Sequence, residues 1–199
     1  MRAKVGIIAE DNSDVETLKI FIRRINPLRF QIKGHSTKGC GRLKKKCTGI
    51  VCHLVRKGIT KIIICHDLDS DDPDKLASLK KALREKVKAS MVPNNNRVIC
   101  IVIPVQELEA WFLADVSIIN KRFIGAKLKE IPNPEKIPSP KEYIEKVSRD
   151  DRWKPRYINT NDNPKLAEVI DIDKVRTKCP AFSPFYDFIS LLRTCAKVG

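Results

Sequence analysis

Three short runs of apolar, mostly β-branched residues stand out along the chain, at residues 5–9, 62–65 and 98–103. None of the three alternates with polar residues, which is typical of strands covered on both faces, as in a parallel sheet flanked by helices. A weaker apolar run over residues 30–33 follows Pro27. The pattern therefore predicts a mainly parallel, four-stranded sheet.

Apolar positions at helical spacing fill the intervals between these runs. The first helix is expected to begin at a capping box formed by Ser13 and Glu16. The second is expected over residues 43–57 and ends at the glycine that follows. The third begins with Asp72 as N-cap, followed by a proline, and runs to about residue 89. Strands and helices that alternate in this way predict an α/β domain with right-handed crossovers.

The chain changes character after residue 115. Residues 130–140 contain four prolines in eleven positions, which favours a linker or an extended connection over a helix. Short helical patterns follow at residues 141–148, 164–169, 173–178 and 183–196. We expect residues 1–115 to form the α/β domain. Residues 116–199 are expected to form the proline-rich connection and a C-terminal helical appendage packed on the core.

The composition and the cysteines favour a protein of the cytoplasm. Of the 199 residues 42% are hydrophobic, too many for a disordered chain, and no apolar run approaches the roughly 20 residues of a membrane span. The seven cysteines form no Cys-x-x-Cys pair, and the N-terminus shows no signal-peptide pattern, so we expect a reducing compartment. Zinc is disfavoured, because the adjacent Cys52 and His53 would point in different directions on a helix.

Basic residues are concentrated in one part of the chain. The sequence has 39 Lys and Arg against 24 Asp and Glu, which gives a net charge of +15. Residues 17–66 contain thirteen of the basic residues and no acid, so the rest of the chain carries a net charge of only +2. A one-sided field of this kind suits a polyanion, although many charge runs are only a solvated face. We expect nucleic acid as the partner, and no membrane.

Acidic residues follow each of the three strong strands at or just beyond its carboxyl end. They are Glu10 and Asp14 after the first strand, Asp67 and Asp69 after the second, and Glu107 and Glu109 after the third. Ligands of open α/β sheets bind outside the carboxyl ends of the strands, so these acids converge if the strands are neighbours. Carboxylates gathered in one place repel one another unless a cation neutralises them, and an oxygen-only set suits Mg²⁺, Mn²⁺ or Ca²⁺.

Three segments that carry these acids resemble a known family. Residues 7–14, Ile-Ile-Ala-Glu-Asp-Asn-Ser-Asp, resemble the strand-Glu-Gly-x-Ser/Thr-Asp/Glu opening of Toprim domains, and residues 66–69, His-Asp-Leu-Asp, resemble their strand-Asp-x-Asp motif. Residues 104–115 are similar to a Toprim-like family with a Glu-x-Glu-Ala-Trp-x-x-Ala-Asp signature, whose aromatic positions we expect in the core. The proline-rich connection and residues 179–183, Cys-Pro-Ala-Phe-Ser, are also similar to that family.

Toprim domains occur in topoisomerases, primases, small-ribosomal-RNA maturases and the overcoming-lysogenization-defect nucleases, where such acids bind magnesium. The resemblance implies that the catalytic residues are Glu10, Asp67 and Asp69. It implies that a Mg²⁺ or Mn²⁺ ion is held by Glu10, Asp14, Asp67, Asp69 and Glu107. Glu107 is preferred to Glu109 because it lies nearer the strand end and the two would face apart on one helix. The chain departs from the motif at Asp11, where Toprim domains have glycine.

The basic stretch also contains a glycine-rich segment, residues 34–41. It is not a P-loop, because Cys40 and Gly41 stand where Lys and Ser/Thr are required. Its backbone N–H groups would still be able to cradle a phosphate, and a plain flexible loop is the alternative. The residues expected to bind nucleic acid are Lys38, Arg42, Lys44, Lys45 and Lys46.

Strand-end acids beside a basic stretch predict a magnesium-dependent phosphodiesterase, and the resemblance implies a Toprim-type nuclease, with a role in anti-phage defence as one possibility. A second hypothesis is a nucleic-acid-binding Toprim-like subunit that is inactive alone and works with an ATPase or as a homo-oligomer. A third is phosphoryl transfer on a small nucleotide. The choice between DNA and RNA, and between one metal and two, stays open at this point.

Overall fold

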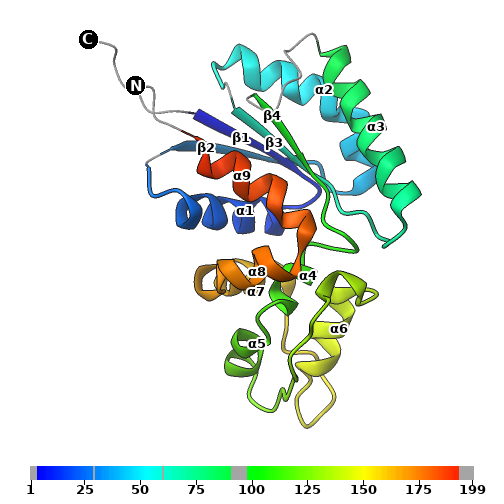
Figure 1. Cartoon of the computed structure of the whole chain (residues 1–199), viewed down its shortest axis with the longest axis vertical. Helices are drawn as coiled ribbons and strands as arrows, with labels where there is room; N and C mark the ends of the chain where they lie inside the picture. Colours follow the sequence, from blue (N-terminus) through cyan, green and yellow to red (C-terminus); the bar gives the residue numbers. More distant parts are fainter. Residues whose placement is uncertain (1–3, 29, 60, 91–97, 193–199) are drawn as a thin grey trace.

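The computed structural model describes residues 4–28, 30–59, 61–90 and 98–192 and contains, within them, one four-stranded sheet (Figure 1). Every strand pairing is parallel, in the order β2-β1-β3-β4. The predicted α/β class with a parallel sheet flanked by helices is confirmed. The strands are β1 (Lys4–Ala9), β2 (Gln31–Ser36), β3 (Lys61–Cys65) and β4 (Ile99–Val102).

Three long helices connect successive strands, and shorter helices follow the last strand. The connecting helices are α1 (Asn12–Ile25), α2 (Cys40–Arg56) and α3 (Pro73–Ala89). The later helices are α4 (Ala110–Leu113), α5 (Val116–Arg122), α6 (Pro140–Val147), α7 (Asn159–Val169), α8 (Ile172–Lys178) and α9 (Ser183–Ser190), with 3-10 turns η1 (Pro134–Lys136) and η2 (Pro180–Phe182). None of the helices in the described residues is long and apolar enough to cross a membrane.

Strands β1, β3 and β4 are buried on both faces, as the uninterrupted apolar runs predicted, whereas the edge strand β2 is partly exposed. Val5, Ile7 and Ala9 of β1 point into one hydrophobic cluster, together with α1 and the helices after β4. Ile8 points into the opposite cluster, which is closed by α2 and α3. The alternation follows from the two-residue repeat of a strand, so β1 contributes to two separate cores. Figure 1 shows α2 and α3 on one side of the sheet and α1 and α9 on the other.

The C-terminal helices complete the core beside α1. The rings of Trp111 on α4 and Phe182 lie 4.8 Å apart between centroids, and Phe21 on α1 lies 5.5 Å from Phe182. The amide of Asn26, just after α1, donates to the carbonyl oxygen of Ile189 at 2.9 Å. The same apolar cluster therefore continues on both sides of residue 115, and the boundary placed there stays a prediction. The expected core position of Trp111 is confirmed.

The start of α1 differs from the predicted capping box. Asp11, rather than Ser13, is the N-cap: its side chain accepts from Asp14 N at 3.0 Å, and Asp14 accepts from Asp11 N at 3.2 Å. Ser13 lies inside the helix, and its hydroxyl donates to the carbonyl oxygen of Asn159 at 2.9 Å. Asp11, at the position where Toprim domains have glycine, has an extended backbone (φ −128°) and needs no left-handed turn.

Other elements begin at residues that differ from the predicted ones, or were not predicted. The N-cap of α3 is Asp72, as predicted, but α2 begins at Cys40, three residues earlier than expected. The short helices α4 and α5 were not predicted, and the proline-rich segment contains η1 and leads directly into α6. The segment is therefore packed structure, with Pro134 buried, and not a simple linker. The last helix, α9, ends at Ser190, before the predicted end at residue 196, which lies outside the described residues.

Gly34 on β2 offers a test of how closely α1 packs on the sheet. A Cβ atom at Gly34 would overlap Cγ1 of Val15, so Gly34→Ala should lower the free energy of unfolding by about 1–3 kcal/mol. Gly49, inside α2, faces open space, and Gly49→Ala should raise it by about 0.5–1 kcal/mol. Urea denaturation of both variants measures the difference. Equal stability of Gly34→Ala and the wild type would contradict the described packing.

Candidate functional site

The loops after the four strands meet at the carboxyl edge of the sheet. The strand order places β1, β3 and β4 side by side, so the acids that follow them become neighbours. Backbone hydrogen bonds then join the loops to one another: Gly39 N donates to Glu10 O at 3.0 Å, and Asp69 N donates to Gln106 O at 2.8 Å. The three strands are therefore neighbours, and the acids that follow them converge at one edge of the sheet.

Four carboxylates, which we call the acidic cluster, interact across this edge: Glu10, Asp14, Asp67 and Glu109. Burial raises the pKa of Asp67 well above its usual range, and the charges of Asp14, Glu109 and Glu10 raise it further. Burial likewise raises the pKa of Asp14, with further increases from Asp11 and Glu109. The cluster therefore carries more negative charge than its surroundings compensate, and it favours a bound cation or bound protons.

Two of these carboxylates are oriented by the backbone around β3. Oδ1 of Asp67 accepts a hydrogen bond from Leu108 N at 3.1 Å, across the loop that follows β4. Oε1 of Glu10 accepts from Asp67 N at 3.2 Å and lies 2.9 Å from Nδ1 of His66. Each side chain is thus held through one oxygen. Among the hydrogen bonds of the described residues, the second oxygen of each carboxylate has no donor.

Glu109 is held from the C-terminal helices. Its Oε1 accepts from Asn163 Nδ2 at 2.9 Å and from the Tyr157 hydroxyl at 3.2 Å, and the same hydroxyl bonds to Oδ1 of Asn163. Burial still raises the pKa of Glu109, although the bonds from Asn163 and Tyr157 lower it in part. Sequence reasoning did not find Tyr157 or Asn163, because they lie 48 and 54 residues from Glu109 in the chain.

His66 fixes the position of Glu10. The imidazole is buried, and Nδ1 lies 2.9 Å from Oε1 of Glu10 and 2.6 Å from the carbonyl oxygen of Asp67. Both neighbours are acceptors, so we assign the proton to Nδ1. Nε2 is buried and has no hydrogen-bond partner among the described residues. His66 therefore orients Glu10 as a hydrogen-bond donor.

Three of the loops at this edge contain a non-glycine residue with a left-handed backbone. These residues are Lys38 (φ 58°), Asp69 (φ 52°) and Gln106 (φ 60°), which follow β2, β3 and β4 respectively. Such a conformation costs about 1–3 kcal/mol and persists only where the surrounding structure enforces it. Strain of this kind is concentrated at functional sites more often than elsewhere, and here it surrounds the acidic cluster.

The remaining predicted acids have other positions. Asp69 is exposed and contributes to the cluster only by raising the pKa of Asp67. Glu107 accepts from Lys141 N at 2.8 Å, and so caps the N-terminus of α6. Burial raises the pKa of Glu107, and its bond from Lys141 lowers it in part. Glu107 and Glu109 do not lie on one helix as expected, because α4 begins only at Ala110, and it is the charge of Glu109 that raises the pKa of Asp14 and of Asp67. Glu107 as a metal ligand stays a prediction.

The basic residues predicted to bind nucleic acid surround the start of α2. They are Lys38, Arg42, Lys44, Lys45 and Lys46, and all five are exposed. The N-cap Gly39 provides no side-chain hydrogen bond, and the first turn of α2 has no acid. Gly39 is also hydrogen-bonded to Glu10 O, so the basic end of α2 lies beside the loop that carries Glu10. An uncapped helix start with flanking cations favours anions.

The acidic cluster fits a hard divalent cation by its chemistry, since it offers carboxylate oxygens and an uncompensated negative charge. Within the described residues, no group of three or more His, Cys, Asp or Glu side chains has the geometry to hold a metal ion. Binding an ion would therefore require side-chain rotations that bring oxygens of Asp67, Asp14 and Glu109 together. The ligand set stays a prediction.

Comparison with known proteins places the chain in a family. Residues 9–190 match the family model described as Domain of unknown function (DUF4276), so the match includes every acid of the cluster. Comparisons with curated proteins and with solved structures found no match.

The raised pKa of Asp67 predicts how stability changes with pH. The folded state binds the proton of the Asp67 carboxyl more tightly than the unfolded state does. The contribution of this proton to the free energy of unfolding is therefore complete below the usual aspartate pKa of about 4, and it is lost as the pH rises through the raised pKa. In metal-free buffer, the advantage of Asp67→Asn over the wild type should therefore grow with pH above about 4. Urea denaturation at several pH values measures it. The exposed Asp74→Asn is the matched control, and an Asp67→Asn curve parallel to it would contradict the described repulsion.

Proposed function

The chain belongs to the DUF4276 family, and we propose that it is a divalent-metal-dependent phosphodiesterase that cleaves nucleic acid. The observation that carries the proposal is the acidic cluster, in which the buried Asp14 and Glu109 and the half-buried Glu10 and Asp67 repel one another at one edge of the sheet. A protein retains such a cluster at a cost in stability, so a functional requirement for the charge explains it best. The resemblance of residues 7–14 and 66–69 to Toprim motifs supports the same activity.

Asp67, Asp14 and Glu109 are the proposed holders of the ion, with Glu10 beside them. A bound Mg²⁺ or Mn²⁺ would polarise the phosphoryl oxygen and lower the pKa of an attacking water. Leu108 N and Asn163 orient Asp67 and Glu109 before any ion arrives. Glu10, held through Oε1 by His66, keeps its other oxygen to accept a proton from the attacking water and to return it to the leaving oxygen. Asp69, exposed at the rim, is proposed to contact the substrate side of the ion.

The basic end of α2 supports a polyanionic substrate. Lys38 and Arg42 lie at the same edge of the sheet as Glu10, so a phosphate held there would be next to the acidic cluster. Lys44, Lys45 and Lys46 continue the charge along α2, which favours a polymer over a small nucleotide. A role in anti-phage defence and a partner ATPase stay predictions that the Toprim resemblance alone supports.

Cleavage is the direct test. Purified protein with Mg²⁺ or Mn²⁺ should cut single-stranded or duplex DNA or RNA, and Asp67→Asn should reduce the rate by more than about 100-fold, because loss of an outer-shell partner alone costs about 10–100-fold. Asp74→Asn, the same chemical change at an exposed position of α3, should retain the activity. Gel analysis of end-labelled substrates measures both rates. Failure to cut all four substrates with either metal, or equal rates in the two variants, would refute the activity.

Metal binding can be tested without activity. If the acidic cluster holds the ion, Mg²⁺ at 100 times its dissociation constant should stabilise the wild type by about 2.7 kcal/mol and raise its melting temperature. The effect should be absent or much smaller in Asp67→Asn and unchanged in Asp74→Asn. Differential scanning calorimetry at neutral pH measures the shift. An equal shift in all three proteins would place the ion elsewhere.

A further inference from the structure

A second surface, formed by the loop after α6, combines an aromatic ring with basic residues. The chain has two tryptophans: Trp111 is fully buried, whereas Trp153 is 76% exposed. Trp153 lies in the loop between α6 and α7, residues 148–157, which we call the Trp153 hairpin. A large aromatic side chain at this exposure contributes almost nothing to the core, so its position needs another explanation.

The Trp153 hairpin is a built structure and not a frayed loop. Arg149 and Pro155 form an antiparallel bridge, and Oδ1 of Asp150 accepts from Arg152 N and Lys154 N, both at 2.9 Å. Trp153 itself has a positive φ of 60°, a conformation that a bulky residue adopts only under constraint. The exposed position of the indole ring is therefore maintained at a cost in backbone conformational energy.

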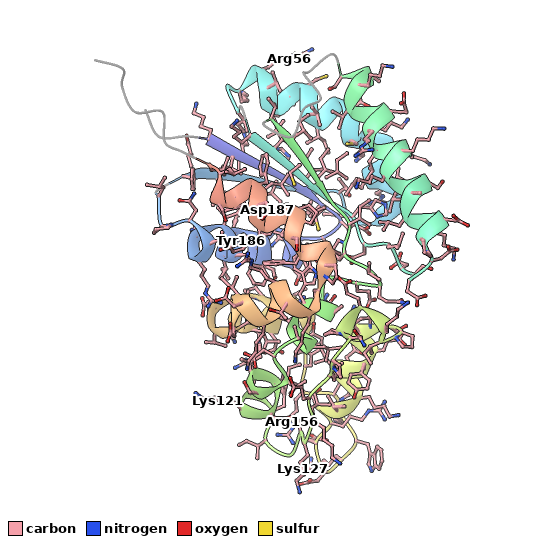
Figure 2. The ribbon with its side chains drawn as sticks, viewed as in Figure 1. Arg56, Lys121, Lys127, Arg156, Tyr186 and Asp187 are labelled. Atoms are coloured by element: carbon pink, nitrogen blue, oxygen red, sulfur yellow. The ribbon has the colours of Figure 1, made fainter. Side chains whose placement is uncertain are left out.

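Basic residues are concentrated in the Trp153 hairpin, and one of them lies over the indole ring. Residues 149–156 contain four of them and two acids, and one acid, Asp150, is engaged by the hairpin backbone. The guanidinium carbon of Arg149 lies 5.9 Å from the centre of the Trp153 ring. Figure 2 shows Lys121 and Lys127 near Arg156 at the end of the molecule opposite the sheet. A positive surface with an exposed ring face suits a phosphate backbone and an unpaired base.

We propose that the Trp153 hairpin binds single-stranded nucleic acid, with one base stacked on Trp153 and the neighbouring phosphates held by Arg152, Lys154 and Arg156. The proposal rests on the proposed function and adds the strandedness of the substrate to it. A duplex keeps its bases stacked on one another, so only an unpaired base can lie on the ring.

The hairpin is joined directly to the acidic cluster. Tyr157, its last residue, donates from its backbone N to Ser148 Oγ at 3.0 Å and from its hydroxyl to Glu109 at 3.2 Å. The four residues from Trp153 to Tyr157 span at most about 14 Å of backbone. Because this connection is short, the same single strand could contact both Trp153 and the acidic cluster.

Tryptophan fluorescence tests the contact. A single-stranded oligonucleotide, added to the wild-type protein in EDTA so that no cleavage occurs, should quench the emission of the exposed Trp153, whereas a duplex of the same sequence should quench it less. Unchanged emission at saturating oligonucleotide would refute the proposal. Quenching by vesicles of anionic lipid, and not by the oligonucleotide, would also overturn it and identify the surface as a membrane contact.

Variants separate stacking from general charge. With a dye-labelled oligonucleotide and anisotropy as the readout, Trp153→Ala should weaken binding at least about fivefold, and Trp153→Phe, which keeps a ring face, should retain most of the affinity. Val169→Ala, a truncation of another exposed apolar side chain, is the matched control. Lys154→Gln should lower the dependence of affinity on salt. Equal binding by Trp153→Ala and the control would refute the proposal.

The outcomes also distinguish this proposal from the nuclease function. If the chain has no phosphodiesterase activity but the hairpin binds single strands, Trp153 is quenched and no substrate is cut. If the nuclease function is right but the hairpin does not contact the substrate, the wild type cuts the substrate and Asp67→Asn does not. Trp153→Ala then cuts and binds the substrate as the wild type does.

Discussion

Repulsion among buried carboxylates at the carboxyl edge of the sheet is the constraint on which the site depends. Parallel pairing of β1, β3 and β4 brings Glu10, Asp14 and Asp67 to one edge, and the loop after β4 adds Glu109. Backbone and side-chain donors satisfy part of each carboxylate, but burial and mutual charge still raise the pKa values of Asp14, Asp67 and Glu109. A bound divalent cation would offset the repulsion among these carboxylates. The proposed chemistry requires the same kind of ion.

The C-terminal helices have two roles that cannot be separated. Phe182 and Phe185 pack on Phe21 and Trp111, so these helices form part of the core beside α1. Tyr157 and Asn163 hold Glu109, so the same part of the chain also completes the acidic cluster. Tyr157, the last residue of the Trp153 hairpin, is buried and therefore belongs both to the hairpin and to the surroundings of Glu109.

Much of the fold could be predicted because its signals are local. The apolar runs gave the strands, and Asp72 followed by proline gave the start of α3. Prediction failed where two local signals competed. Ser13 and Asp11 both suit an N-cap; in the folded chain Asp11 and Asp14 form the reciprocal capping hydrogen bonds, and the hydroxyl of Ser13 donates to Asn159 of α7 instead. The helices α4 and α5 have 4 and 7 residues, too short for a periodic pattern, so their formation depends on burial against the rest of the core.

The sequence by itself determined the fold class, the presence of acids at three strand ends and the concentration of basic charge, because each of these is a property of residue order. Only the tertiary structure decided which acids share a space. Glu107 and Glu109 are two residues apart and chemically equivalent, yet Glu107 caps α6 and Glu109 enters the acidic cluster. The physical reason is that Asn163, Tyr157 and Lys141, which direct the two side chains, are distant in sequence and reach them only after the chain has folded.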